Sequence, residues 1–233
     1  NKILLSLLVL IVTIAGFIYG PKAIRLYNLA NLYDEDSIAS NFINIDKIFT
    51  VSDPIPAAEE AYLFNKRDYE LPETYFFDGE ERNLQEGLEH FKTDGLIVLH
   101  NGDMLYENYW NGNSSESKHI AFSVSKSFLS ALIGIAVGDG LIESIEDPVT
   151  KYLPDFNGTG YEGVRIKDIL QMSSGVKFNE DYADPNSDIN IFGRAVARGS
   201  SFRDFAKTLE REKTPGTYHH YVSIDTQVLG FLL

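Results

Sequence analysis

A serine and a lysine at the start of a long apolar segment constrain this chain more than any other feature. Ser123 precedes Lys126 by three positions, and apolar or small residues then continue to Val137, before Asp139-Gly140. The pattern predicts a buried helix that ends at the glycine, which readily adopts the left-handed conformation that closes helices. Residues three apart share one helix face, so the amine of Lys126 can reach the hydroxyl of Ser123. In the first turn, unpaired N–H groups and the helix dipole would favour negative charge on the serine oxygen.

The same pair predicts nucleophilic chemistry that needs no histidine. A serine beside an amine can be activated for attack on an acyl group. The spacing also occurs by chance in many helices, and taken alone it favours an ordinary helix start that carries an exposed lysine. The remaining motifs of the chain have to decide between these two interpretations.

Composition excludes several classes of function. The chain has 34 acidic and 20 basic residues, a net charge of −14, which argues against a nucleic-acid partner because phosphate binding needs a basic surface. It has no cysteine, so disulfides, thiolate metal sites, cysteine nucleophiles and a lipoprotein anchor are excluded. Asp181, Asp184 and Asp188 lack the spacing of a calcium loop, and we expect a solvated loop there. No metal and no organic cofactor is predicted.

The N-terminal segment differs in kind from the rest. Ile3 to Gly20 carries no charged residue, and its length lies at the lower edge of the roughly 17–25 residues of a membrane span. A cleaved signal peptide, whose apolar region is usually about 7–15 residues, is the rival interpretation. A buried core helix of a soluble protein is a further alternative. We expect an uncleaved transmembrane signal anchor over residues 1–21, a stalk over 22–70 and a folded domain over 71–233.

Turn signals divide the rest of the chain into short elements. Gly95–His100 reads as a strand that returns through Asn101-Gly102, a strong hairpin signal, into a second strand over 104–110. A capping box at Ser201–Asp204 predicts the start of a helix. Further expected elements are a short helical piece after Asp147-Pro148, a helix over 166–172, a loop over 178–190, the end of the capped helix at 214–216, and a helix with Asp225 in its first turn.

Four blocks of sequence together resemble a known family. In chain order they are FSVSKSFLSALIGIAVGDGLI, DPVTKYLPDF, IKDILQMSSGV and PGTYHHYVSIDTQVLG. They resemble the serine β-lactamase and penicillin-binding-protein superfamily, above all its class C-related branch of esterases, D-aminopeptidase-like enzymes and 6-aminohexanoate-oligomer hydrolases. The resemblance runs from about Gly95 to Leu233. It implies an α+β (α/β) fold of the β-lactamase/transpeptidase type, a helical subdomain plus an antiparallel sheet, here preceded by the N-terminal transmembrane helix.

The resemblance also implies roles for individual residues. Ser123 corresponds to the acylated nucleophile and Lys126 to its proton-transfer partner. Tyr221 matches the tyrosine of the family's Tyr-x-Asn/Ser element, with Ser223 as a substrate-binding third position. A phenol with an ordinary pKa of about 10 is a poor base, but a cationic lysine favours the phenolate, which can then relay the serine proton. The backbone N–H of Ser123 would supply part of an oxyanion hole.

The same resemblance bears on Tyr182 and on two neighbouring histidines. Tyr182 lies in a loop that covers the active site in the nylon-oligomer branch, where a tyrosine sits near the leaving amine. It is therefore a candidate substrate-binding residue, and the alternative is an ordinary turn tyrosine. His219 and His220 precede Tyr221, but no Gly-x-Ser-x-Gly elbow exists for a Ser-His-Asp site. We expect both histidines to be strand or loop residues.

The chain departs from the family pattern in two ways. The Lys/His-x-Gly element that follows the tyrosine motif by a long interval does not occur before Leu233, so we expect a C-terminally truncated portion of the domain. Ser223 stands where many lactamases carry asparagine, which favours an esterase or amidase over a β-lactamase.

These observations predict a membrane-anchored serine hydrolase that cleaves a small-molecule amide or ester through a Ser-Lys-Tyr acyl-enzyme mechanism. Its catalytic domain is expected on the periplasmic or extracellular side. Two alternatives remain at this point: a non-catalytic or slowly acylating penicillin- or peptidoglycan-binding sensor, and a truncated chain that is not a competent enzyme. Short esters, D-amino-acid peptides, linear amides and β-lactams are all left open as substrates.

Overall fold

A computed structural model of the chain describes residues 6, 13–14, 16–21, 23–24, 27–28, 30–48, 53–56 and 58–233. The chain divides into two compact units, Asn1–Ile120 and Ala121–Leu233. Most of the predicted anchor, Ile3 to Gly20, lies outside the described residues. In the part that is described, no helix has both the length and the apolar character needed to cross a bilayer.

The first unit contains a small sheet with a hairpin at its centre. Strand β4 (Gly95–His100) pairs antiparallel with β5 (Asp103–Tyr109), and β1 (Asn65–Lys66) adds to β5 in parallel, giving the order β1-β5-β4. The predicted hairpin is confirmed. Its turn residues, Asn101 and Gly102, have φ values of 50° and 85°, the left-handed conformation that the favoured two-residue turn requires.

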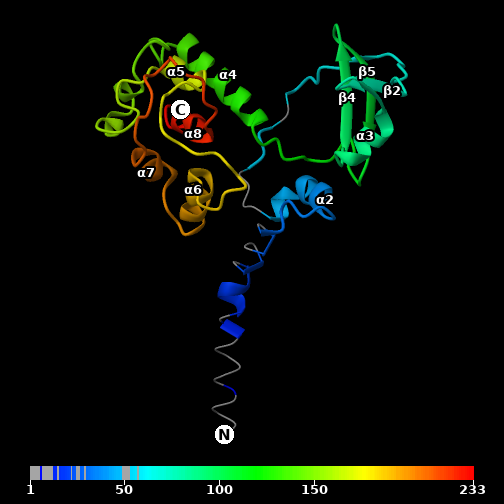
Figure 1. Cartoon of the computed structure of the whole chain (residues 1–233), viewed down its shortest axis with the longest axis horizontal. Coiled ribbons are helices and arrows are strands. Elements are labelled where there is room, and N and C mark those ends of the chain that lie inside the picture. The colour runs from blue at the N-terminus through cyan, green and yellow to red at the C-terminus, as the bar shows by residue number, and fades with distance from the viewer. Residues whose placement is uncertain are drawn as a thin grey trace. The chain divides into compact units, whose positions relative to one another are not determined.

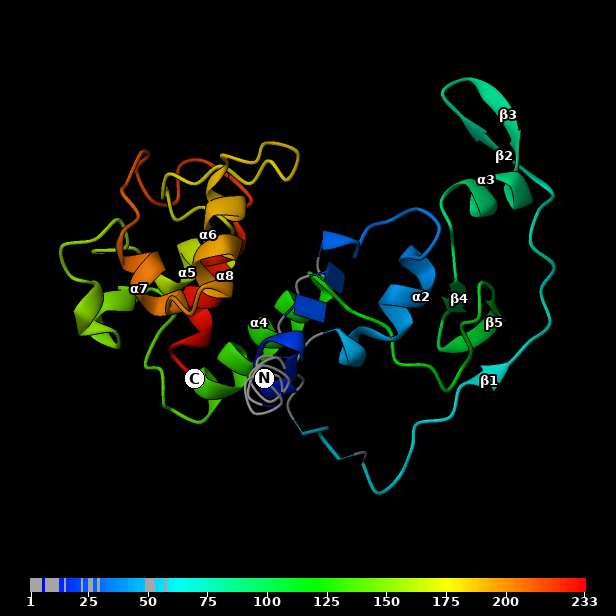
Figure 2. The ribbon, with the colours of Figure 1, turned by 90° about the horizontal axis from the view of Figure 1, so that it is seen from below.

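A second hairpin and a helix complete the first unit. Strands β2 (Thr74–Phe77) and β3 (Glu80–Asn83) pair antiparallel and lead directly into helix α3 (Leu84–His90). Figure 2 shows this hairpin at one end of α3 and the β4–β5 pair beyond the helix. The Asn83 side chain accepts a hydrogen bond from the Glu86 N–H at 3.0 Å and so caps the helix. Nearer the N-terminus lie α2 (Ile38–Ile43) and the 3-10 helix η1 (Ile45–Lys47).

The second unit is helical. Its elements are α4 (Val124–Gly138), the 3-10 helices η2 (Val149–Lys151) and η3 (Pro154–Phe156), α5 (Ile166–Leu170), α6 (Asp188–Ala197), α7 (Phe202–Lys207) and α8 (Ser223–Gly230). Helix α8 packs against α4, α5 and α7 (Figure 1). Apolar side chains from these helices and the turns between them form one buried core, which includes Ile133, Phe156, Tyr161, Ile166, Ile169, Val222 and Val228.

The central helix of this unit is buried on one side only. Helix α4 ends as predicted, with Gly140 at a φ of 74°. The expectation of a fully buried helix is wrong within this unit. Ile133 and Ala136 join the core through the face that meets α8, whereas Phe128 and Leu132 are at least half exposed.

Two expected boundaries also need correction. The loop predicted over 178–190 gives way earlier to α6, because the Ser187 side chain accepts a hydrogen bond from the Asn190 N–H and starts the helix at Asp188. The helix capped by Ser201 stops at Lys207 instead of continuing to 214–216. The chain beyond it turns to accept a backbone hydrogen bond from the Gly160 N–H at Leu209, so tertiary pairing ends the helix there.

Candidate active site

Ser123 stands at the N-cap of α4, and its hydroxyl is not used to cap the helix. A serine at this position usually accepts a hydrogen bond from a backbone N–H of the first turn, but the Ser123 side chain makes no such bond. The residue before it, Phe122, has a φ of 39°. A left-handed conformation at a bulky residue costs on the order of 1–3 kcal/mol and is typical of functional sites.

The structure brings the three predicted catalytic residues together. Ser123 Oγ accepts hydrogen bonds from Lys126 Nζ at 3.0 Å and from the Tyr221 hydroxyl at 2.8 Å. Lys126 Nζ also lies 5.3 Å from the centre of the Tyr221 ring. Ser123 is exposed, Lys126 is half-buried and Tyr221 is 42% exposed, so the cluster is open to a ligand.

Backbone pairing explains why a residue far along the chain reaches Ser123. The segment before Tyr221 runs beside the turn that follows α5, and the His220 N–H donates to the Met172 carbonyl at 2.8 Å. A glycine makes this approach possible. Gly175 has a φ of 76°, and a Cβ placed there would lie 2.2 Å from the Lys213 carbonyl oxygen.

The surroundings of Tyr221 lower the pKa of its phenol. Partial burial raises the pKa of its phenol, but the hydrogen bonds with Ser123 and Lys126 and the positive charge of Lys126 outweigh this, so that the pKa lies below the ordinary 10.0. Tyr221 donates to Ser123 Oγ while it is neutral. Once the phenol is ionised, the same contact lets the serine hydroxyl donate to the phenolate. The geometry therefore suits proton transfer from Ser123.

The two predicted substrate-binding residues meet at a carboxylate that sequence analysis did not single out. Glu180 Oε1 accepts hydrogen bonds from Ser223 Oγ at 2.5 Å and from the Tyr182 hydroxyl at 3.0 Å, and Oε2 accepts from the Ser223 N–H at 2.5 Å. Burial and then the bond to Glu180 raise the pKa of Tyr182. Glu180 stands only two residues before Tyr182, but no spacing distinguishes it from the other acidic residues of this loop.

The other candidates take structural roles. His119 Nε2 lies 2.9 Å from Asp94 Oδ2, within the first unit. His219 and His220 are exposed, and among the described residues neither makes a side-chain hydrogen bond with Ser123.

The acidic loop uses its carboxylates for its own turns. Asp181, Asp184 and Asp188 accept backbone N–H groups of neighbouring loop residues at 2.7–2.9 Å. The described residues contain no cluster of acidic or histidine side chains that could hold a metal ion.

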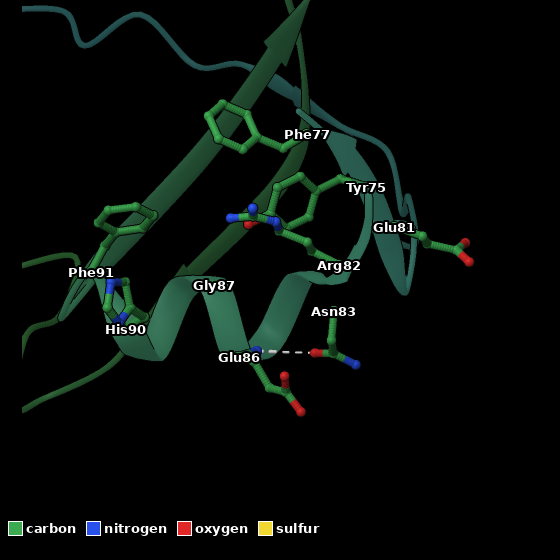
Figure 3. A pocket seen from close by; sticks show the side chains of 9 residues that line it. All are labelled: Tyr75, Phe77, Glu81, Arg82, Asn83, Glu86, Gly87, His90 and Phe91. Atoms are coloured by element: carbon green, nitrogen blue, oxygen red, sulfur yellow. Dashed lines mark hydrogen bonds between the residues drawn. The ribbon is translucent and has the colours of Figure 1, made fainter. Parts of the chain in front are cut away.

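A separate hollow lies in the first unit, between the β2–β3 hairpin and α3. It has a volume of about 560 Å³. Figure 3 shows Tyr75, Phe77 and Phe91 around it, with Arg82 among the rings and the carboxylate of Glu86 turned away. The Arg82 guanidinium lies 5.0 Å from the centre of the Phe77 ring. None of the residues that line the hollow belongs to the Ser123 cluster.

Comparison with known proteins places the chain in a family. A family model described as Beta-lactamase matches residues 81–233. The 6-aminohexanoate-dimer hydrolase of Paenarthrobacter ureafaciens is 30% identical over 158 residues, which are 65% of this chain and 40% of that protein. A protein of Salmonella agona (strain SL483) with the provisional name D-alanyl-D-alanine carboxypeptidase is 32% identical over 104 residues, 42% of this chain and 23% of the other.

A solved structure supports the same fold. A Bacillus anthracis protein that carries the provisional name 6-aminohexanoate-dimer hydrolase superposes with a TM-score of 0.75 at 20% identity, over 87% of this chain and 55% of that one. The chain thus spans only 40% to 55% of the length of these two relatives. Because the family model covers well over half of its residues, the chain belongs to the beta-lactamase family and has that family's α+β fold.

Proposed function

We propose that this chain carries the acylation site of a serine hydrolase, with Ser123 as the nucleophile that cleaves an amide or ester bond. The observation that carries the proposal is the double contact at Ser123 Oγ, 3.0 Å from Lys126 Nζ and 2.8 Å from the Tyr221 hydroxyl. Membership of the beta-lactamase family and the hydrolase name of a relative support it.

The chemistry follows from these contacts. Tyr221, ionised beside Lys126, takes the proton of Ser123 while Oγ attacks the carbonyl carbon of the substrate. The backbone N–H of Ser123 faces the developing oxyanion. As the bond to the leaving nitrogen or oxygen breaks, Tyr221 passes the proton to that atom and an ester on Ser123 remains. Water then attacks this ester and gives a proton to Tyr221. Tyr221 passes that proton to Ser123 Oγ as the bond between Oγ and the acyl carbon breaks, and the acid is released.

We propose a small-molecule amide as the first substrate class to test. The name of the Paenarthrobacter relative specifies a linear amide dimer, and Ser223 in place of asparagine favours an amidase or esterase over a β-lactamase. Tyr182 and Ser223 would contact the substrate. Both hydroxyl groups donate to the Glu180 carboxylate, and Ser223 follows Tyr221 by two residues.

The N-terminal segment gives a second part of the proposal. We propose that residues 1–21 anchor the protein in a membrane, that 22–70 form a stalk, and that 71–233 belong to a hydrolase domain on the periplasmic or extracellular side. The uncharged run from Ile3 to Gly20 supports this. The untreated protein should be recovered in the membrane fraction. Protease added to intact cells should digest its hydrolase domain. Recovery of the native protein in the soluble fraction would contradict the anchor.

The acylation site is tested by intact-mass spectrometry after reaction with a fluorophosphonate probe. We expect one adduct on Ser123 of the full-length protein, no adduct after Ser123→Ala, and labelling slowed by about 10²-fold or more after Lys126→Ala. Ser125→Ala is the matched control, because Ser125 Oγ donates to the Phe122 carbonyl at 2.6 Å instead of facing Lys126.

The outcomes separate the alternatives. Labelling together with turnover of an amide or ester panel supports the hydrolase. Labelling without turnover would move the assignment to a slowly acylating sensor. A folded protein that forms no adduct would overturn the site.

A further inference from the structure

We propose that Glu180 is a positioning residue of this site: its carboxylate fixes the start of helix α8, and thereby the place of Tyr221 beside Ser123. The proposal rests on the function proposed above, and it concerns a residue that no motif of the sequence marks.

The carboxylate binds Ser223 twice. Oε2 accepts the Ser223 N–H and Oε1 accepts the Ser223 hydroxyl, both at 2.5 Å. Hydrogen bonds to a carboxylate are shorter and about twice as strong as neutral ones. Ser223 is the first residue of α8, and its N–H is one of those that a helix leaves without an internal partner. Glu180 therefore caps α8 from a segment 43 residues earlier in the chain.

This cap bears directly on Tyr221, which lies two residues before Ser223. The Tyr221 hydroxyl must stay within hydrogen-bond distance of Ser123 Oγ, now 2.8 Å. Displacing a reacting group by about 1 Å can cost roughly 10²-fold in rate. Val222, between the two residues, is 1% exposed and fixes the segment from the core side. Glu180 fixes it from the side of the acidic loop.

The segment that supplies Glu180 is itself held. Phe178 is 2% exposed. The Asn179 N–H donates to Asp188 Oδ2 at 2.7 Å, and the Asn179 carbonyl accepts the Ile189 N–H at 3.1 Å. The carboxylate is thus presented from a segment anchored to the core and to the first turn of α6, as a positioning role requires.

Glu180 also affects the electrostatics of the site. Lys126, from α4, lowers the pKa of Tyr221, and the negative charge of Glu180 raises it. The Tyr182 phenol donates to the same carboxylate. Glu180→Gln removes the charge and should therefore lower the pKa of Tyr221, while its amide oxygen can still accept one of the two Ser223 hydrogen bonds. Glu180→Ala removes both acceptors and should loosen the position of Tyr221 further. The two effects can be measured separately.

The experiment compares Glu180→Gln and Glu180→Ala with the unchanged full-length protein. Fluorophosphonate labelling rates are measured from pH 5 to 10, beside kcat and KM for an ester substrate. The matched control is Glu212→Gln, a 50% exposed side chain in the same unit whose nearest cation, Lys213, is 3.9 Å away. We expect Glu180→Ala to slow labelling by about 10²-fold. With the ester substrate, the loss should fall mainly on kcat and leave KM largely unchanged. Glu180→Gln should retain more of the rate and shift its alkaline rise to lower pH, and the control should change neither.

A second variant, Ser223→Ala, tests whether Glu180 and Ser223 act on the rate through their shared contact, which a general loss of folding would not imitate. Ser223→Ala removes one of the two contacts and leaves the N–H contact intact. In the Glu180→Ala, Ser223→Ala double variant, the combined loss of rate should be smaller than the product of the single losses, because Glu180→Ala alone already removes the contact with the Ser223 hydroxyl. A combined loss equal to that product would overturn the proposal.

The remaining outcomes are also decisive. If the unchanged protein labels at Ser123 and Glu180→Gln keeps its pH profile, the positioning role is wrong while the proposed function stands. If the folded, unchanged protein does not label at Ser123, the proposed function and the positioning role fall together.

Discussion

The buried carboxyl group of Asp225 should make the stability of the protein depend on pH, and one substitution can isolate its contribution. Asp225 lies in the first turn of α8 and is 0% exposed. Its Oδ1 accepts a hydrogen bond from the Tyr161 hydroxyl at 2.8 Å, while Oδ2 has no hydrogen-bond partner among the described residues. Burial raises the pKa of Asp225 from 3.8 to about 7, against the smaller opposing effects of Tyr161 and Ser174.

The sign and size of the effect follow from this shift. Because the folded state holds the Asp225 proton more tightly than the unfolded state, the contribution to stability is fully present below pH 4. It is lost as the pH rises to about 7. A shift from 3.8 to about 7 corresponds to about 4 kcal/mol of unfolding free energy, at about 1.4 kcal/mol for each unit. Asp225→Asn has no titration and keeps an oxygen that can accept from Tyr161.

The assay is urea unfolding of the unchanged protein and of Asp225→Asn, from pH 4 to pH 8. The free energy of unfolding of the Asn variant, relative to the unchanged protein, should rise by about 4 kcal/mol across this range. Asp139→Asn, an exposed carboxyl at the end of α4, controls for the loss of one negative charge. A difference that stays constant with pH would refute the assignment of a buried, protonated carboxyl at this position.

Four further substitutions test the packing and the chemistry of the second unit. Gly175→Ala should cost about 2–4 kcal/mol of unfolding free energy, because its methyl group would meet a backbone oxygen at 2.2 Å. Gly158→Ala, with a similar φ of 78° but open space around it, should cost only about 1–2 kcal/mol; equal losses in thermal melts would contradict the steric argument. Tyr161→Phe should cost about 1–3 kcal/mol and raise the pKa of Asp225 further, so the loss of stability should extend to higher pH in the same urea titration. Tyr221→Phe should slow fluorophosphonate labelling by about 10²- to 10⁴-fold and abolish its rise at alkaline pH, and a persisting rise would assign the base to another group.

Local spacing explains what could be predicted from the sequence. The Ser123–Lys126 contact depends only on positions three apart in one helix turn, and the Asn101-Gly102 turn depends only on its two residues. Both are confirmed by the structure. The position of Tyr221 came from the family resemblance, since no local pattern joins residues that lie 98 positions apart.

Long-range packing explains what was missed. Glu180 looks like any other acidic loop residue until the fold brings it to Ser223. Asp225 reads as an ordinary acidic residue in a first helical turn, where negative charge is favoured, and only its enclosure by the core changes that. The exposed side of α4 was missed for the same reason, because an apolar run does not reveal how many of its faces meet a partner.

The start of α8 joins the site to the stability of the unit. Two carboxyl groups meet this helix end: Glu180 is half-buried and binds the Ser223 N–H, whereas Asp225 is wholly buried in the first turn. The helix dipole favours a charge on both, but at Asp225 the cost of burial outweighs it, and the charge of Glu180 raises the pKa of Asp225 further. Glu180→Gln should therefore lower the pKa of Asp225 and move the loss of stability to lower pH in the urea titration. An unshifted titration would mean that the two carboxyl groups do not interact, and that the site and the core are not coupled through α8.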